Sequence, residues 1–322
     1  EHRKKISLFC NVDIKNVIQT VDLKTIYEAP ISFNSEKLDQ HVLDYFKLKS
    51  KKKVNLKPWK KITKVVLNPK KHVNIAIIGK YVNLKDAYKS LDEALVHGGI
   101  ENKLKVNLIR IESDNLKPSD IKSKLKNVSG IVIPGGFGKR GTEGKIAAIK
   151  YARLNKIPFL GICFGMQMSI IEFARNVLKI KSASSTELNQ KCTPVVGLIH
   201  EWKKDGKIIK GTNKDLGGTM RLGLYEAILL NNSLIKNIYK SKSIKERHRH
   251  RYEVNINYKN QFEKKGLIFS GNSPDKNLPE IIELKNHPWF IGVQFHPEFK
   301  SRPLSPHPLF SSFIKAAKNH QK

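Results

Sequence analysis

The sequence predicts an α/β fold, in which an open, mostly parallel sheet carries helices on both faces and antiparallel strands are added to it. Two observations lead to this prediction. From residue 73 to residue 174, short apolar runs alternate with runs of helical period, the pattern of consecutive strand–helix units. Beyond residue 191, short apolar runs follow one another closely, which is typical of antiparallel strands.

The individual elements follow in chain order from these runs. In the alternating region, strands are expected at 73–79, 106–111, 130–134 and 157–162, and helices at 86–97, 119–126, 144–155 and 165–174. Gly98 and Gly99 are expected to end the helix at 86–97. In the later region, strands are expected at 195–200, 222–230, 252–256, 266–270, 281–284 and 290–295, followed by a helix at 309–318.

The segment before residue 72 has a different pattern. Residues 6–12 form an apolar run that predicts a strand, and residues 35–48 carry apolar side chains at helical spacing. So few elements cannot bury much of a core alone. The lysine-rich residues 49–71 predict a basic linker. The chain is therefore divided into 1–48, 49–71 and 72–322.

Composition limits the class of protein. The chain has 322 residues, 39% of them hydrophobic, which is enough for one large domain with an appendage or for two domains. No apolar run reaches the roughly 18 residues of a membrane span, and no signal peptide opens the sequence. Three cysteines are too few for a disulfide framework. We expect a soluble cytoplasmic protein that does not associate with a membrane.

The net charge of +32 suggests a nucleic-acid-binding module. The charge is carried by 50 lysines and only 10 arginines, and the lysines are scattered through every segment. Readout of phosphates and bases relies on arginine, so this distribution favours solvated lysine-rich faces and no nucleic-acid partner. Three of the ten arginines lie together at 247–251.

Cys163 lies where the strand predicted at 157–162 passes directly into a helix. Gly161 and Gly165 flank it and allow a sharp turn and the close approach of a substrate. The helix that begins beside the sulfur offers free N–H groups and a positive dipole end, which favour thiolate over thiol. The position predicts a nucleophile, although a buried structural cysteine is an equally good explanation of this turn alone.

A cysteine nucleophile needs a base, and the base needs a partner that orients it. His296 and Glu298 lie at the end of the strand predicted at 290–295. Alternate residues of an extended chain share a face, so these two side chains are expected to project together. The glycines that follow the strand at 130–134 can offer N–H groups to an oxyanion, and we expect the N–H groups of Gly136 and Phe164 to do so.

The residues Gly161–Gly165 together with His296, Pro297 and Glu298 resemble the class I, or triad, glutamine amidotransferase family. Several further stretches resemble its CTP synthase branch, namely 86–90, 134–144, 185–187, 215–223, 246–255 and 286–290. Residues 6–30 resemble the last part of the synthase (amidoligase) domain of that branch, so 1–48 is interpreted as its C-terminal remnant and 72–322 as the amidotransferase domain. The resemblance implies a glutaminase-like fold with a flavodoxin-like core.

The resemblance also implies the roles of the residues. Cys163 attacks the side-chain amide of L-glutamine, and His296, oriented by Glu298, protonates the departing ammonia and then activates water. The implied contacts with glutamine are Gly136, Phe164, Gly165, Met166, Gln167, Glu187 and Arg251. Glu187 suits the α-ammonium of the substrate and Arg251 its α-carboxylate. Phe137 and Arg140 correspond to the positions that contact the activator GTP.

The chain lacks a glycine-rich phosphate loop of the form G-x-x-x-x-G-K-[ST]. We therefore expect no cofactor and no metal on this chain. A missing synthase domain would bring ATP, Mg and UTP. By resemblance, the full-length protein would form a homo-oligomer, namely a tetramer. The expected activity is glutamine-dependent CTP synthesis, in pyrimidine nucleotide biosynthesis, with glutaminase activity on this chain. Another triad glutamine amidotransferase and a nucleic-acid-binding module without catalysis are the alternatives.

Overall fold

The computed structural model describes residues 1–50, 52–82, 84, 86–198, 202–204, 207–209 and 220–321. Its contacts divide the chain into two compact units, Glu1–Lys71 with Lys103–Lys105, and His72–Asn102 with Val106–Lys322. The assignment of 1–48, 49–71 and 72–322 to particular domains stays a prediction.

The first unit is helical. Its helices are α1 (His2–Cys10), α2 (Ala29–Ser35), α3 (Leu38–Tyr45) and α4 (Lys57–Leu67), with 3-10 turns at Ile14–Asn16 and Ile26–Glu28. The strand expected at 6–12 is wrong, because most of that segment lies in α1. Short apolar runs do not distinguish strand from helix. Leu8 and Phe9 are 79% and 85% exposed, so no buried sheet face selects the extended form.

Two further expectations about the first unit need correction. The helix expected at 35–48 is broken, because Lys37 adopts a left-handed backbone conformation with φ 58° between α2 and α3. The expected linker contains α4, which begins at Lys57 with Pro58 in its first turn, where proline is compatible with a helix. Ile62 of α4 is buried, so packing stabilises the helix despite its many lysines.

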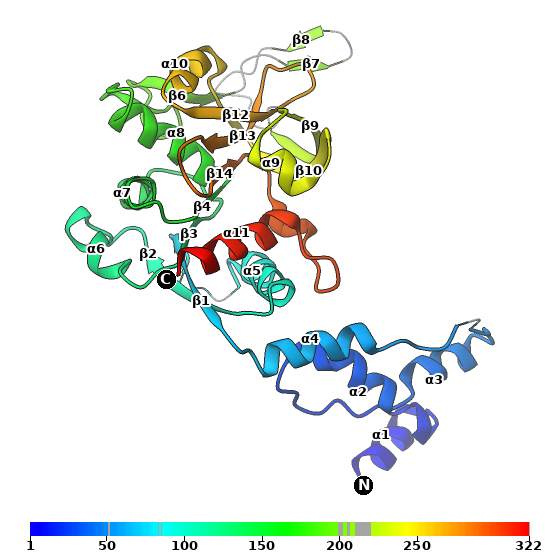
Figure 1. Cartoon of the computed structure of the whole chain (residues 1–322). Helices are drawn as coiled ribbons and strands as arrows, with labels where there is room; N and C mark the ends of the chain where they lie inside the picture. The colour runs from blue at the N-terminus through cyan, green and yellow to red at the C-terminus, as the bar shows by residue number, and fades with distance from the viewer. Residues whose placement is uncertain are drawn as a thin grey trace. The chain divides into compact units, whose positions relative to one another are not determined.

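The second unit is built on one large sheet (Figure 1). Among the described residues, its strand order is β10-β9-β12-β13-β14-β4-β3-β1-β2. The strands are β1 (His72–Gly79), β2 (Lys105–Glu112), β3 (Gly130–Ile133), β4 (Phe159–Ile162), β9 (Arg221–Leu229), β10 (Ser243–His250), β12 (Leu267–Asn272), β13 (Pro279–Leu284) and β14 (Phe290–Val293).

The sheet has a parallel part and an antiparallel part. The pairs β1–β3, β3–β4 and β4–β14 are parallel, whereas β13–β14, β12–β13, β9–β12 and β9–β10 are antiparallel. The predicted fold class is confirmed. Strands β3, β4 and β14 lie side by side and all end at the same edge, where ligands of open α/β sheets bind.

Helices cover both faces of the sheet. On one face α5 (Lys89–Glu101) packs against α11 (Pro308–His320), and on the other α7 (Thr142–Leu154) packs against α8 (Phe164–Asn176). The alternation along β1 separates these layers: Ile75 lies with Phe313 of α11, whereas Ala76 belongs to the core beneath α7 and α8. The remaining helices are α6 (Ile121–Lys124), α9 (Leu234–Tyr239) and α10 (Lys259–Lys264).

Helix α5 corrects one prediction. Gly98 and Gly99 do not end it, because the helix runs to Glu101. A Cβ on Gly98 would lie 2.8 Å from the carbonyl oxygen of Phe310, so glycine permits the close approach of α11 at this position. Gly98 therefore serves helix packing here.

Two smaller sheets complete the unit. Strands β5 (Ala183–Ser185), β6 (Thr193–Leu198) and β11 (Tyr252–Val254) form one, and β7 (Trp202–Lys204) and β8 (Lys207–Ile209) form the other. Short 3-10 turns lie at Pro118–Asp120, Ile256–Tyr258 and Pro297–Lys300. The sequence pattern did not predict β5, β7, β8 or β10. The end of the strand expected at 195–200 and most of the stretch 215–223 lie outside the described residues.

Candidate active site

Cys163 occupies the turn between β4 and α8, as predicted. Its backbone has φ 50° and ψ −101°, a conformation that costs a side-chain-bearing residue about 1–3 kcal/mol. Two hydrogen bonds keep it there: its N–H donates to the Val293 carbonyl at 2.7 Å, and its carbonyl accepts from the Gln167 N–H at 3.2 Å. Strain at a buried residue between a strand and a helix is characteristic of a nucleophile turn.

The two glycines that flank Cys163 bring α8 close to the sheet. A Cβ on Gly161 would lie 2.8 Å from the backbone of Gly165, and a Cβ on Gly165 would lie 2.2 Å from the carbonyl oxygen of Ile133. Neither position can accept a larger residue without movement of the backbone. The N-terminal end of α8 is therefore held beside the sulfur, with N–H groups that have no intrahelical acceptor.

His296 and Glu298 come together as predicted. The His296 Nδ1 lies 2.7 Å from Glu298 Oε1, and the two side chains are only 12% and 10% exposed. Burial alone lowers the pKa of His296, but the negative charges of Cys163 and Glu298 and hydrogen bonds to both outweigh it and raise that pKa to about 11. The imidazole is therefore protonated at neutral pH and lies between the sulfur and the Glu298 carboxylate.

Cys163 and His296 line a cavity of about 570 Å³, within the size range of small-molecule sites, and Glu298 contacts His296 from outside that lining. Of the predicted site residues, those that line it are Gly136, Phe137, Cys163, Gln167, Glu187, Arg251 and His296. Additional lining residues that were not assigned roles from the sequence are Tyr81, Ala87, Tyr88, Gly135, Met220, Arg249, His250 and Tyr252. The cavity thus brings together segments from 81 to 296.

Two charged groups in the cavity differ in their partners. Glu187 accepts a 2.6 Å hydrogen bond from the N–H of Gly138. Burial raises its pKa, against the effects of that hydrogen bond and of Lys80. Arg251 has a buried Nη1 without a hydrogen-bond partner among the described residues. An unpartnered buried guanidinium nitrogen is costly unless an anion occupies the site.

Comparison with known proteins agrees with this geometry. Residues 83–316 match the model of the glutamine amidotransferase class-I family, and residues 1–48 match that of the CTP synthase N-terminus. The chain belongs to the class I glutamine amidotransferase family. The glutaminase domain of Trypanosoma brucei CTPS, solved with bound acivicin, is 34% identical with a TM-score of 0.69; the match covers 77% of this chain and 94% of that one.

Curated CTP synthases are similar over nearly the whole chain. The enzyme of Pelagibacter ubique is 78% identical over 321 residues, 100% of this chain and 60% of the relative. That of Rhizobium johnstonii is 55% identical over 316 residues, 98% of this chain and 58% of the relative. This amidotransferase chain therefore spans about 60% of the length of the curated relatives it matches.

Some predicted site residues lie outside the cavity lining of this amidotransferase. Phe164, Gly165 and Met166 form the buried first turn of α8, so any contact they make with a ligand would come from their backbone. Arg140 forms an ion pair with Asp114 at 2.7 Å. Phe137, by contrast, lines the cavity, and the centroid of its 66% exposed ring lies 5.0 Å from the Lys80 ammonium. The roles of these residues stay predictions.

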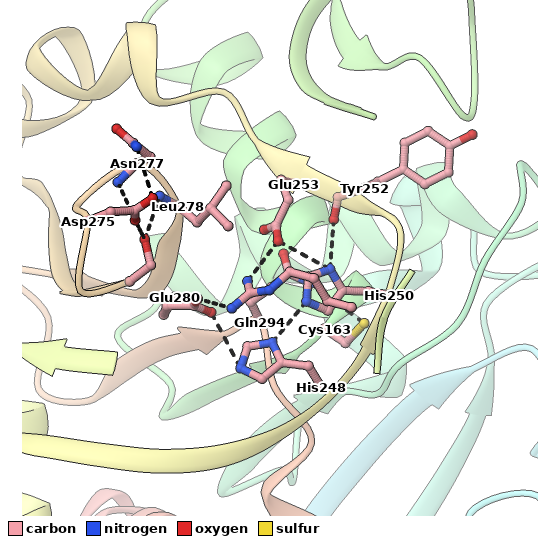
Figure 2. A network of polar contacts seen from close by, with 12 residues as sticks. Cys163, His248, His250, Tyr252, Glu253, Asp275, Asn277, Leu278, Glu280 and Gln294 are labelled. Atoms are coloured by element: carbon pink, nitrogen blue, oxygen red, sulfur yellow. Dashed lines mark hydrogen bonds and ion pairs between the residues drawn. The ribbon is translucent and has the colours of Figure 1, made fainter. Parts of the chain in front are cut away.

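A buried polar network (Figure 2), which the sequence analysis missed, reaches the cavity at His250. Arg221 of β9 donates to Glu253 at 2.8 Å and to Glu280 at 2.7 Å. The His248 and His250 rings approach within 2.9 Å of each other, and His250 Nδ1 lies 3.1 Å from the Tyr252 carbonyl. The signal available in the sequence was the alternation of histidine and arginine along β10. In a strand this alternation places each histidine on the buried face and each arginine on the exposed face.

Burial controls the protonation states in this network. Desolvation and the nearby Arg221 charge lower the pKa of His248, and they lower that of His250 to about 3. Both rings are therefore neutral at pH 7. Desolvation raises the pKa of Glu253 to about 8 despite its contact with Arg221. The network is thus held by one cation and two carboxyl groups, with the histidines as neutral hydrogen-bonding partners.

The described residues contain no cluster of three or more His, Cys, Asp or Glu side chains that could hold a metal ion. No helix in the described part of the chain is long and apolar enough to cross a membrane.

Proposed function

We propose that this chain hydrolyses L-glutamine to glutamate and ammonia as the glutaminase part of a CTP synthase. The observation that carries the proposal is that Cys163 and His296, the latter bound to Glu298, line a cavity that also contains an acidic and a basic side chain. Glutamine has an α-ammonium for Glu187, an α-carboxylate for Arg251 and an amide that can reach the sulfur.

The proposed reaction proceeds in two halves. The Cys163 thiolate forms a bond to the amide carbon of glutamine, and the N–H groups of Gly136 and Phe164 bind the oxyanion. The imidazolium of His296 donates its proton to the leaving nitrogen, so the C–N bond breaks, ammonia departs and a γ-glutamyl thioester remains. Neutral His296 then takes a proton from water, which attacks the thioester and releases glutamate.

We propose that a separate synthase part consumes the released ammonia to aminate UTP to CTP with ATP and Mg²⁺ in pyrimidine nucleotide synthesis. GTP is the proposed activator, with the exposed ring of Phe137 to stack on the purine, the Lys80 cation over that ring and the Arg140 cation over the ring of Tyr81. Homo-oligomerisation and a cytoplasmic location belong to the same proposal.

The direct test is ammonia release by the purified chain and by Cys163→Ala. The variant should lose at least about a thousandfold in kcat, because the nucleophile has no substitute in the cavity. Cys10→Ala is the matched control, since Cys10 is an exposed cysteine of the other unit and should not matter. Unchanged turnover in Cys163→Ala would reject the proposal. Repeating the assay with the synthase part and GTP added tests the proposed activation.

A further inference from the structure

Gln294 lies beside the sulfur of Cys163 and has no role in the scheme above. Its side chain is completely buried, and its Nε2 lies 3.7 Å from Cys163 Sγ (Figure 2). Gln294 precedes His296 by two residues in the segment that follows β14, so the alternation of an extended chain sends both side chains the same way. One segment therefore delivers two polar groups to the same sulfur.

The surrounding hydrogen bonds determine which end of the Gln294 amide faces the sulfur. The Tyr252 backbone carbonyl can only accept, so the group of Gln167 that lies 2.9 Å from it must be the NH₂. The same NH₂ lies 3.3 Å from the Gln294 side chain, which must therefore present its oxygen. The NH₂ group of the Gln294 side chain then faces Cys163. This orientation of the amide is assigned from its hydrogen-bond partners.

The backbone of Gln294 is also fixed. Its N–H donates to the Glu280 carbonyl at 2.8 Å, and the Glu280 carboxylate is bound by the buried Arg221. The side chain has no solvent on any side, because its exposure is 0%. A donor that is buried and held from both ends can remain directed at one atom through a reaction.

We propose that Gln294 is a further catalytic residue, whose side-chain N–H stabilises the thiolate of Cys163, and that Gln167 positions it. The inference rests on the proposed role of Cys163 as nucleophile. A hydrogen bond to a charged acceptor is stronger than one to a neutral acceptor, so this donor favours the thiolate over the thiol. It also favours the sulfur as leaving group when water breaks the thioester, because the negative charge returns to the same atom.

The test is alkylation of the full chain by iodoacetamide across a range of pH, with each cysteine followed by mass spectrometry. Gln294→Met keeps the length of the side chain and removes its donors. We expect the midpoint of the Cys163 alkylation profile to rise by about one pH unit and kcat to fall about tenfold. Gln167→Met should move the midpoint in the same direction by less. The exposed Cys10 of the same sample is the internal reference.

Phe295→Leu is the control for general disturbance of the core. Phe295 is equally buried and adjacent in sequence, and its ring lies 5.9 Å from that of His248. This variant should lower the melting temperature and leave the Cys163 midpoint unchanged. An unshifted midpoint in Gln294→Met would overturn the role of Gln294, and one in Gln167→Met alone would overturn only the positioning role of Gln167. Full ammonia release by Cys163→Ala would instead reject the nucleophile, so the two failures are distinguishable.

Discussion

The two sides of the cavity are built in different ways. On the side of Cys163 and His296, short local segments place each functional group: a tight turn for the cysteine and two alternate residues for the histidine and Glu298. On the β10–β11 side, the cavity residues lie over a buried ionic network whose members come from β9, β10, β11 and β13. The first side holds the residues of the proposed chemistry, and the second is held by buried ion pairs.

The comparison predicts that substitutions on the two sides fail differently. Loss of a group on the catalytic side should reduce turnover and leave the fold intact, because its members are few and locally held. Loss of a group on the network side should reduce stability, because it leaves buried charges without partners. The predictions below run from the largest expected effect to the smallest.

Glu298→Gln should lower kcat for glutamine hydrolysis by about 10³–10⁴-fold, as loss of the orienting carboxylate does in other triads. The neutral amide cannot stabilise the imidazolium and can hold the ring in the wrong tautomer. Steady-state ammonia release measures the change, and thermal unfolding should show a melting temperature near that of the unmodified chain. A loss of activity that merely follows unfolding would contradict the assignment of Glu298 to the catalytic side.

Arg221→Met should destabilise the second unit by about 3–5 kcal/mol, because two buried carboxyl groups lose their cation. The Arg221 side chain is 3% exposed and contacts both Glu253 and Glu280. Denaturant unfolding measures the loss. The matched control is Arg247→Met on the neighbouring strand: Arg247 is exposed, so the change should stay within about 0.5 kcal/mol. Equal effects of the two substitutions would remove the distinction between the two sides.

The same contrast explains what the sequence could and could not predict. Cys163 and the pair His296 and Glu298 were predictable because a turn between glycines and an i, i+2 spacing are local properties. The network was not, because Arg221 meets Glu280 only through the register of β9 and the order of strands. Gln294 shares the spacing that identified His296, but its importance depends on Gln167, 127 residues earlier.

The misassigned elements have a similar cause. Residues 6–12 and the glycines at 98–99 were interpreted from local propensity, whereas their final state depends on what packs against them. The parallel core was predictable because each of its strands is buried on both faces and is followed by a helix or a loop of recognisable pattern.

Arg251→Lys should raise KM for glutamine about tenfold and change kcat less, because a lysine cannot form the two-pronged contact with the substrate carboxylate. Arg251 directly follows β10, a strand of the network side. Its buried Nη1 nonetheless has no hydrogen-bond partner among the described residues. Arg247→Lys is the control and should leave both constants unchanged. An effect of Arg251→Lys on kcat alone would place this residue with the catalytic side.

The smallest predicted effect is on the alkaline limit of activity. His296 must carry a proton to release ammonia, and the charges of Cys163 and Glu298 raise its pKa in the free chain. Because the Glu298 charge contributes to this elevation, Glu298→Gln should lower the pKa of His296 and move the alkaline limb of kcat to lower pH, by about one unit or more. The residual activity of the variant, measured across the alkaline range beside the unmodified chain, checks the sign. If the alkaline limb of the kcat profile moved to higher pH instead, Glu298 would not stabilise the imidazolium. The assignment of Glu298 to the catalytic side of the cavity would then be wrong.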